Sequence, residues 1–126
     1  GSGNQIRGYL NIIDTLQCIY LAIKNRPQKG TLKIYNQFTE QLSVNQIART
    51  IKEAGDNLSL KVEIQNIVNP RKENEEHYYN ASKEGFKKLG LNPTLFTNKV
   101  ATNLLETLFK YKDKIDPSKI LPRINW

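Results

Sequence analysis

The feature that most constrains this chain is a repeated change from strand-like runs to helical repeats. Residues 6–13 (IRGYLNII) are rich in β-branched and aromatic side chains, which are typical of strands. Apolar residues at helical spacing follow, and Asp14 and Gln17 have the spacing of a capping box at the start of a helix. The first part of the chain is therefore predicted to form a strand followed directly by a helix.

A second strand–helix–strand pattern is expected downstream. We predict strands over residues 31–38 and 61–68. Between them, a helix should open with the capping pair Ser43 and Gln46 and close at Gly55.

The last third of the chain is predicted to be helical. A short helix over residues 81–89 should stop at Gly90, and a longer one should run over residues 98–112 before Asp116 and Pro117 end it. The side chains expected to face inward are Val44, Ile47, Ala48 and Ile51 in the middle helix and Ala101, Leu104, Leu105 and Leu108 in the last one.

The length and the order of these elements point to one fold class. With 126 residues the chain has the length of a single domain, and a β-α-β-α-β order followed by helices is typical of an α/β fold with a parallel-leaning sheet. Three short strands make a narrow sheet, and a parallel sheet needs cover on both faces. The pattern favours a portion of a larger doubly wound protein, or pairing with another chain, a second copy included.

Charge and cysteine content narrow the possible functions. The formal net charge of +7, from 19 Lys and Arg against 12 Asp and Glu, favours anionic partners, phosphates first. The single cysteine, Cys18, excludes a disulfide framework and a cysteine-based metal cluster, and it fits a reducing compartment. The sequence contains no apolar run of membrane-spanning length, and its first residues do not have the pattern of a signal peptide. We expect a cytoplasmic or plastid-stromal protein without a membrane partner.

Four sequence blocks carry a resemblance to a known family. QIRGYLNIIDTLQCIYLAI, YNQFTEQLSVNQIA, NPRKENEEHYYNA and ILPRINW occur in this order and together resemble the C-terminal part of the UDP-sulfoquinovose synthase family, in the extended short-chain dehydrogenase superfamily. The resemblance implies the C-terminal, substrate-binding portion of a Rossmann-type fold. It also implies UDP-glucose or a related UDP-sugar as partner, with sulfite as co-substrate, and NAD bound by an N-terminal half that this chain lacks.

The resemblance also implies binding residues. In similar proteins the arginines of RGY and NPR, here Arg7 and Arg71, reach the diphosphate of the UDP-sugar, and a guanidinium suits that role because it binds phosphate through two parallel hydrogen bonds. On residue type alone, the favoured interpretation is that both arginines are solvated surface charges, the usual fate of arginine.

Further candidates for substrate binding come from two other positions. Gln37, Thr39 and Glu40 lie at the end of a predicted strand and just after it, where α/β proteins place ligand contacts, although such side chains also cap helices. Glu76 and His77 lie in the EEHYYNA block; a lone histidine is weak evidence for a metal or proton-transfer site, and no metal is expected.

One short motif has the spacing of a catalytic pair. Tyr79 and Lys83 match the Tyr-x-x-x-Lys dyad of short-chain dehydrogenases, but no glycine-rich phosphate loop precedes them. We therefore expect no catalytic residue in this chain, and no activity from the chain alone. The alternative function is an independent basic α/β module that binds nucleic acid or another polyanion, which the scattered positions of the basic residues disfavour.

Overall fold

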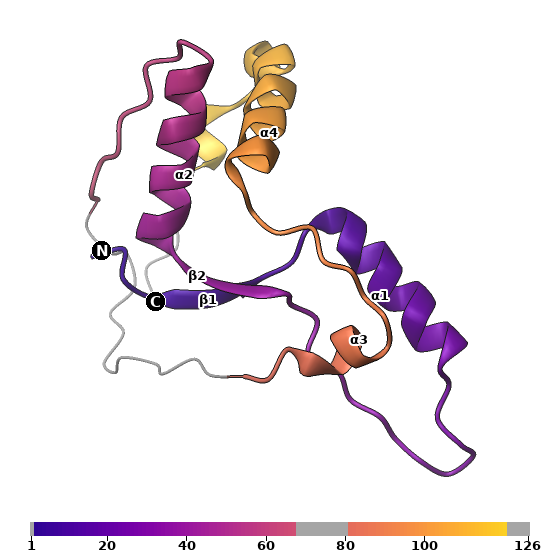
Figure 1. Ribbon diagram of the computed structural model, residues 1–126. Coiled ribbons are helices and arrows are strands. Elements are labelled where there is room, and N and C mark those ends of the chain that lie inside the picture. Colours follow the sequence, from indigo (N-terminus) through magenta and orange to yellow (C-terminus); the bar gives the residue numbers. More distant parts are fainter. Residues whose placement is uncertain (1, 68–80, 121–126) are drawn as a thin grey trace. The chain divides into compact units, whose positions relative to one another are not determined.

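The computed structural model describes residues 2–67 and 81–120 (Figure 1). The elements in chain order are β1 (Ile6–Tyr9), α1 (Ile12–Lys24), β2 (Glu40–Ser43), α2 (Val44–Asn57), α3 (Glu84–Lys88), α4 (Asn98–Lys110) and two 3₁₀ turns, η1 (Lys112–Lys114) and η2 (Pro117–Lys119). They fall into two compact units. The strand unit comprises the described residues in 6–42 and 81–96, and the helix-pair unit comprises those in 2–5, 43–67 and 97–120.

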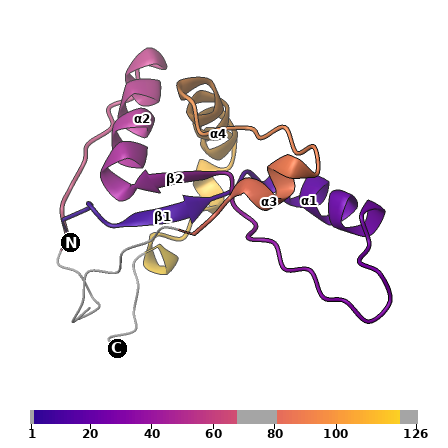
Figure 2. The same cartoon turned by 60° about the horizontal axis from the view of Figure 1, so that its bottom comes forward.

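The strands β1 and β2 form an antiparallel pair (Figure 2). The Thr39 N–H donates to the Tyr9 carbonyl at 2.9 Å, and the Asn45 N–H donates to the Gly3 carbonyl at 2.9 Å, so rising numbers on one strand meet falling numbers on the other. The chain is thus α/β with few strands plus helices, but the expectation of a parallel-leaning sheet is wrong for this pair.

Two predicted strands are wrong within the described residues. Residues 31–38 and 61–67 run without regular secondary structure. Their alternating apolar side chains suit a pleated surface, but a strand also needs a neighbour for its N–H and C=O groups. In the described part of the chain, only β1 and β2 pair with each other.

The helix α1 begins three residues earlier than its predicted capping box indicates, because its cap is Asn11 and not Asp14. The Asn11 side chain caps it by accepting a hydrogen bond from the Ile13 N–H at 3.0 Å, so the strand β1 ends at Tyr9 and does not reach residue 13. Asp14 therefore lies inside the first turn and is fully buried. The assignment of Asp14 as the capping residue is wrong because Asn11 already occupies that position.

The interior of the strand unit lies between α1 and α3. Cys18 packs there against Phe86 and Leu91, and Phe86 also contacts the ring of Tyr35 at a centroid distance of 5.1 Å. The other apolar side chains around this cluster are Leu10, Leu21, Ala22 and Leu89. The helix α3 is shorter than the predicted span of 81–89, and Gly90 follows it with φ +97°, as expected for a residue that ends a helix.

The helix α2 opens with the predicted capping box. The Gln46 N–H donates to Ser43 Oγ at 3.1 Å, and the Ser43 N–H donates to Gln46 Oε1 at 2.7 Å. Gly55 does not close the helix: it is buried inside it against Val62, where an added Cβ would collide with the valine side chain. The left-handed residue after the helix end is Ser59, with φ 56°.

The helices α2 and α4 pack side by side (Figures 1 and 2). Ala54 and Ala101 are the buried apolar residues of these two helices. Of the predicted inward positions, Ala101 is buried, Ile47, Ala48, Ile51 and Leu105 are half-buried, and Val44, Leu104 and Leu108 are exposed. The helix α4 ends at Lys110, two residues before the predicted end and well before Asp116.

Candidate functional site

Arg7 and Gln41 are opposite residues of the two-stranded pair. The hydrogen bond between Thr39 and Tyr9 fixes the register, which places Arg7 across from Gln41, and directly opposite side chains share one face of a sheet. Arg7 is half-buried, and its Nη1 donates to the Ile6 carbonyl at 3.0 Å. The side-chain Nε2 of Gln41 is buried without a hydrogen-bond partner in the described part of the chain.

Glu40 lies on the other face of the same pair. It is adjacent to Gln41, and successive side chains of a strand point to opposite faces. Its Oε1 accepts a hydrogen bond from the Phe96 N–H at 2.6 Å. The structure therefore separates two of the predicted site residues, Arg7 and Glu40, and gives the glutamate a partner within the chain.

Asp14 performs a similar role from α1, and sequence reasoning missed it. Its Oδ2 accepts from the Thr94 N–H at 2.7 Å, and its Oδ1 accepts from Thr94 Oγ1 at 3.2 Å and from Gln17 Nε2 at 3.4 Å. Together with Glu40, it holds the segment 91–96, so two carboxylates from separate elements fix one loop.

Gln37 and Thr39 also contact backbone groups of the strand unit. Gln37 Nε2 donates to the Thr15 carbonyl at 3.4 Å, and Thr39 Oγ1 donates to the Tyr9 carbonyl at 3.3 Å. Gln37 is exposed and Thr39 is half-buried. These contacts leave part of each side chain accessible to a ligand. A substrate-binding role for Gln37 and Thr39 stays a prediction.

The candidates from the second half of the sequence lie mostly outside the described residues. This applies to Arg71, Glu76, His77 and the Tyr79 of the Tyr-x-x-x-Lys motif. Lys83 is described and exposed, directly before α3.

Cys18 is a buried thiol in the interior of the strand unit. Its side chain is buried, and burial raises the pKa of the thiol above its ordinary value. The charge of Asp14 raises this pKa further, while a hydrogen bond with the Gln37 side chain lowers it. Because nucleophilic cysteines need a lowered pKa and access, Cys18 serves packing.

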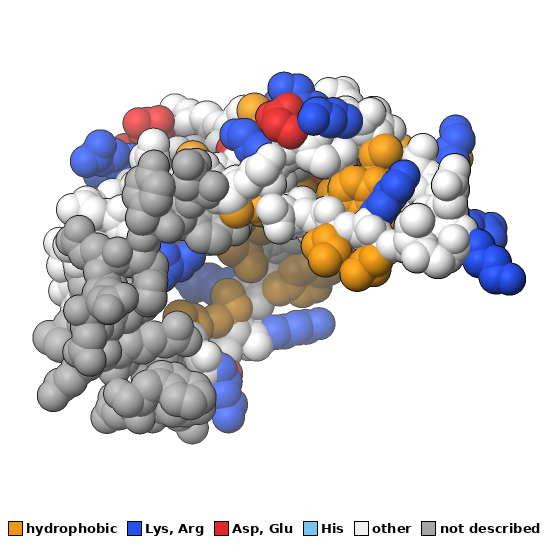
Figure 3. Space-filling view, turned by 90° about the horizontal axis from the view of Figure 1, so that it is seen from below, with side chains coloured by type: hydrophobic (Ala, Val, Ile, Leu, Met, Phe, Trp, Pro, Cys, Tyr) orange, Lys and Arg blue, Asp and Glu red, His pale blue; other side chains and the backbone are white. Residues whose placement is uncertain are grey.

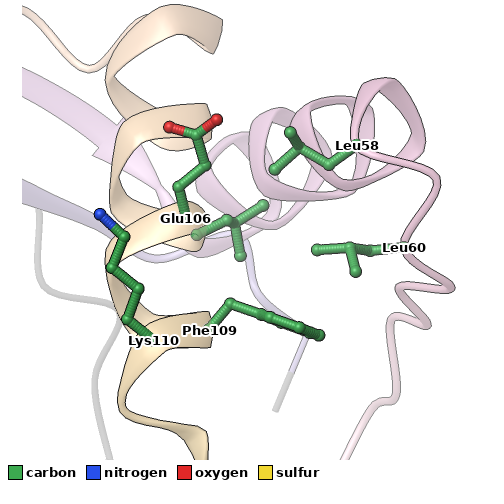
Figure 4. Close-up of a pocket in the computed structure, with 6 residues that line it drawn as sticks. Leu58, Leu60, Glu106, Phe109 and Lys110 are labelled. Atoms are coloured by element: carbon green, nitrogen blue, oxygen red, sulfur yellow. The ribbon is translucent and has the colours of Figure 1, made fainter.

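A separate hollow lies in the helix-pair unit, with a volume of about 500 Å³ (Figure 4). Its lining residues are Leu58, Leu60, Leu105, Glu106, Phe109 and Lys110. Figure 4 shows Leu60 facing Phe109, while the charged ends of Glu106 and Lys110 point away from Leu60. The wall is therefore mainly apolar and lacks the converging donors that a diphosphate requires.

Within the described residues there is neither a membrane-spanning helix nor a cluster of metal ligands. No helix there is both long and apolar enough to span a membrane. No group of three or more histidine, cysteine or acidic side chains in residues 2–67 and 81–120 is arranged to hold a metal ion.

Comparisons with known proteins identify relatives. No family model matches the chain. The whole chain is 44% identical over 126 residues to the chloroplastic UDP-sulfoquinovose synthase of Spinacia oleracea and 38% identical over 128 aligned residues to the UDP-sulfoquinovose synthase of Sulfolobus acidocaldarius. It spans 26% and 33% of the length of these relatives, within their C-terminal parts. These matches do not favour the polyanion-binding alternative. The chain is thus homologous, over its whole length, to the C-terminal part of UDP-sulfoquinovose synthases.

Proposed function

We propose that this chain supplies part of the UDP-sugar site of a UDP-sulfoquinovose synthase-like enzyme with an extended short-chain dehydrogenase fold. The observation that carries the proposal is the match over the whole chain to two proteins with that name, one from a plant and one from an archaeon. The reaction would join UDP-glucose and sulfite to give UDP-sulfoquinovose, with the displaced hydroxyl oxygen leaving as water.

The strand pair offers a suitable place for an anionic group. A guanidinium from Arg7 and an amide donor from Gln41 share one face, and the buried amide lacks a partner among the described residues. A buried donor without a partner is costly, and a ligand oxygen would remove that cost. We assign the diphosphate of the UDP-sugar to this face, with Arg71 as a second contact.

NAD and the acid/base groups are assigned to the region that precedes the match in the longer relatives. The chain itself has no glycine-rich phosphate loop in its sequence. The purified chain, assayed with UDP-glucose and sulfite and examined for nicotinamide by absorbance and mass spectrometry, should show neither turnover nor bound NAD. Steady turnover or stoichiometric NAD would refute this assignment.

The diphosphate contact is testable by calorimetry with UDP. The protein to titrate is a chimera in which this chain replaces the matching part of the spinach relative, so that the remainder of the site is present. Arg7→Ala should weaken UDP binding about ten- to a hundredfold, since a charge-assisted hydrogen bond contributes about 1.5–3 kcal/mol. Arg7→Lys should lie between wild type and alanine, because lysine keeps the charge but loses the planar fork.

Matched variants make the result specific. Arg71→Ala should behave like Arg7→Ala, and the double variant should depart from additivity because both side chains act on one ligand group. Arg49→Ala, at an exposed position of α2, should leave UDP affinity unchanged. If Arg7→Ala is folded and binds UDP as tightly as wild type, the diphosphate does not lie on this face.

A further inference from the structure

The helix α1 has two apolar faces, and only one of them is covered within its unit. The inner face carries Asp14, Cys18, Leu21 and Ala22 and packs into the strand unit. The opposite face, here called the outer face, is exposed. Its residues are Ile12, Ile13, Leu16, Ile19, Tyr20 and Ile23, each between 51% and 77% exposed.

Helix geometry shows that the outer face is a separate surface. At 3.6 residues per turn, Leu16 points about 200° away from both Asp14 and Cys18, so it lies on the far side of the helix. A surface helix normally carries polar residues there, and a helix that is apolar all round is normally buried. With 13 residues, α1 is too short to span a membrane. A packed protein surface is the usual cover of such a face.

More apolar surface lies on the segment that follows α1. Leu32 and Ile34 are 83% and 81% exposed, and their spacing of two suits an extended segment that presents both side chains on one side. Figure 3 shows hydrophobic side chains exposed among lysine and arginine side chains on one face of the molecule. Exposed apolar surface of this kind marks interaction sites more often than isolated exposed residues do.

The relatives indicate what covers the outer face. The chain matches only their C-terminal 26% and 33%, so most of each relative precedes the matched part. A second copy of this chain is a poorer cover, because each copy carries a net charge of +7 and two copies repel. We infer that the outer face of α1 packs on an apolar surface of the region that precedes the match in a synthase-like protein.

This inference rests on the relationship to the synthases in the proposed function, but not on any contact with UDP. The probe is the region of the spinach relative that precedes the match, co-expressed with the full chain carrying an affinity tag. The wild-type chain should co-purify with this probe. The double variant Leu16→Glu/Ile19→Glu should reduce recovery of the probe at least about tenfold, because two buried apolar side chains are replaced by charges.

A control and a second measurement keep the result specific. Ile120→Glu makes the same kind of change at a residue that is 68% exposed, equal to Leu16, but outside α1, and it should retain the probe. In the isolated chain, the double variant should melt no lower than wild type, since both positions are exposed there. Failure of the wild type to co-purify, equal recovery by the double variant, or a homodimer of the chain that the double variant dissociates would each overturn the inference. Loss of UDP binding with intact co-purification would refute the proposed function alone.

Discussion

At the scale of single residues, Cys18 shows how burial changes chemistry. Burial and the Asp14 charge raise the pKa of its thiol, so the folded chain holds that proton more tightly than the unfolded chain. The unfolded thiol ionises first, at about pH 8.5, so this contribution to stability is complete below that pH and declines as pH rises towards the folded pKa. The free energy of unfolding, measured with urea, should therefore fall more steeply between about pH 8 and 9.5 for wild type than for Cys18→Ala.

Thiol labelling checks the same residue independently. At pH 8 a disulfide reagent should modify native Cys18 slowly and the urea-unfolded thiol rapidly. Equal rates in both states, or equal pH profiles for wild type and Cys18→Ala, would contradict the buried position.

At the scale of elements, the capping box at the start of α2 is visible in the sequence, and its contribution to stability can be measured. Ser43→Ala removes the side-chain acceptor of the Gln46 N–H and should lower the free energy of unfolding by about 1 kcal/mol. Arg49→Ala, on an exposed position of the same helix, should change it by less than about 0.5 kcal/mol. Urea titrations of the two variants beside wild type would show whether the cap contributes as expected.

Local signals of this kind explain which elements could be predicted. The capping box of α2 depends on residues three apart, and Gly90 acts through its own backbone angle, so both are visible in the sequence. The strands predicted over residues 31–38 and 61–68 needed distant partners that a sequence pattern does not reveal. The start of α1 was misplaced because Asn11 and Asp14 are both good capping residues, and only the structure decides between them.

In the candidate site, too, the contacts between residues far apart in the sequence could not be predicted. Arg7 was identified through a resemblance, and its position opposite Gln41 depends on a register that sequence alone does not fix. Glu40 and Asp14 bond to backbone groups 56 and 80 residues away, so their role in holding residues 91–96 could not be predicted from spacing. A buried carboxylate with backbone donors is recognised only from coordinates.

At the scale of the whole molecule, the division into two units predicts whether the free-energy costs of two substitutions add. Asp14→Asn should cost about 1–3 kcal/mol, because it weakens charged hydrogen bonds to both the N–H and the hydroxyl of Thr94. Thr94→Ala removes one of the same bonds, so the pair Asp14→Asn and Thr94→Ala should be coupled by at least about 0.5 kcal/mol. Urea unfolding of the single and double variants measures this coupling.

The Asp14/Thr94 set is a first double-mutant cycle, within the strand unit. A second cycle combines Asp14→Asn in the strand unit with Ser43→Ala in the helix-pair unit. The two side chains belong to different units and share none of the hydrogen bonds described above, so their costs should add within about 0.5 kcal/mol. The first cycle is the internal control, since it uses the same Asp14 variant with a direct partner. Coupling between Asp14 and Ser43 as large as that between Asp14 and Thr94 would show that the chain unfolds around one shared interior. Additivity in the second cycle and coupling in the first would instead establish that each unit keeps its own network of contacts.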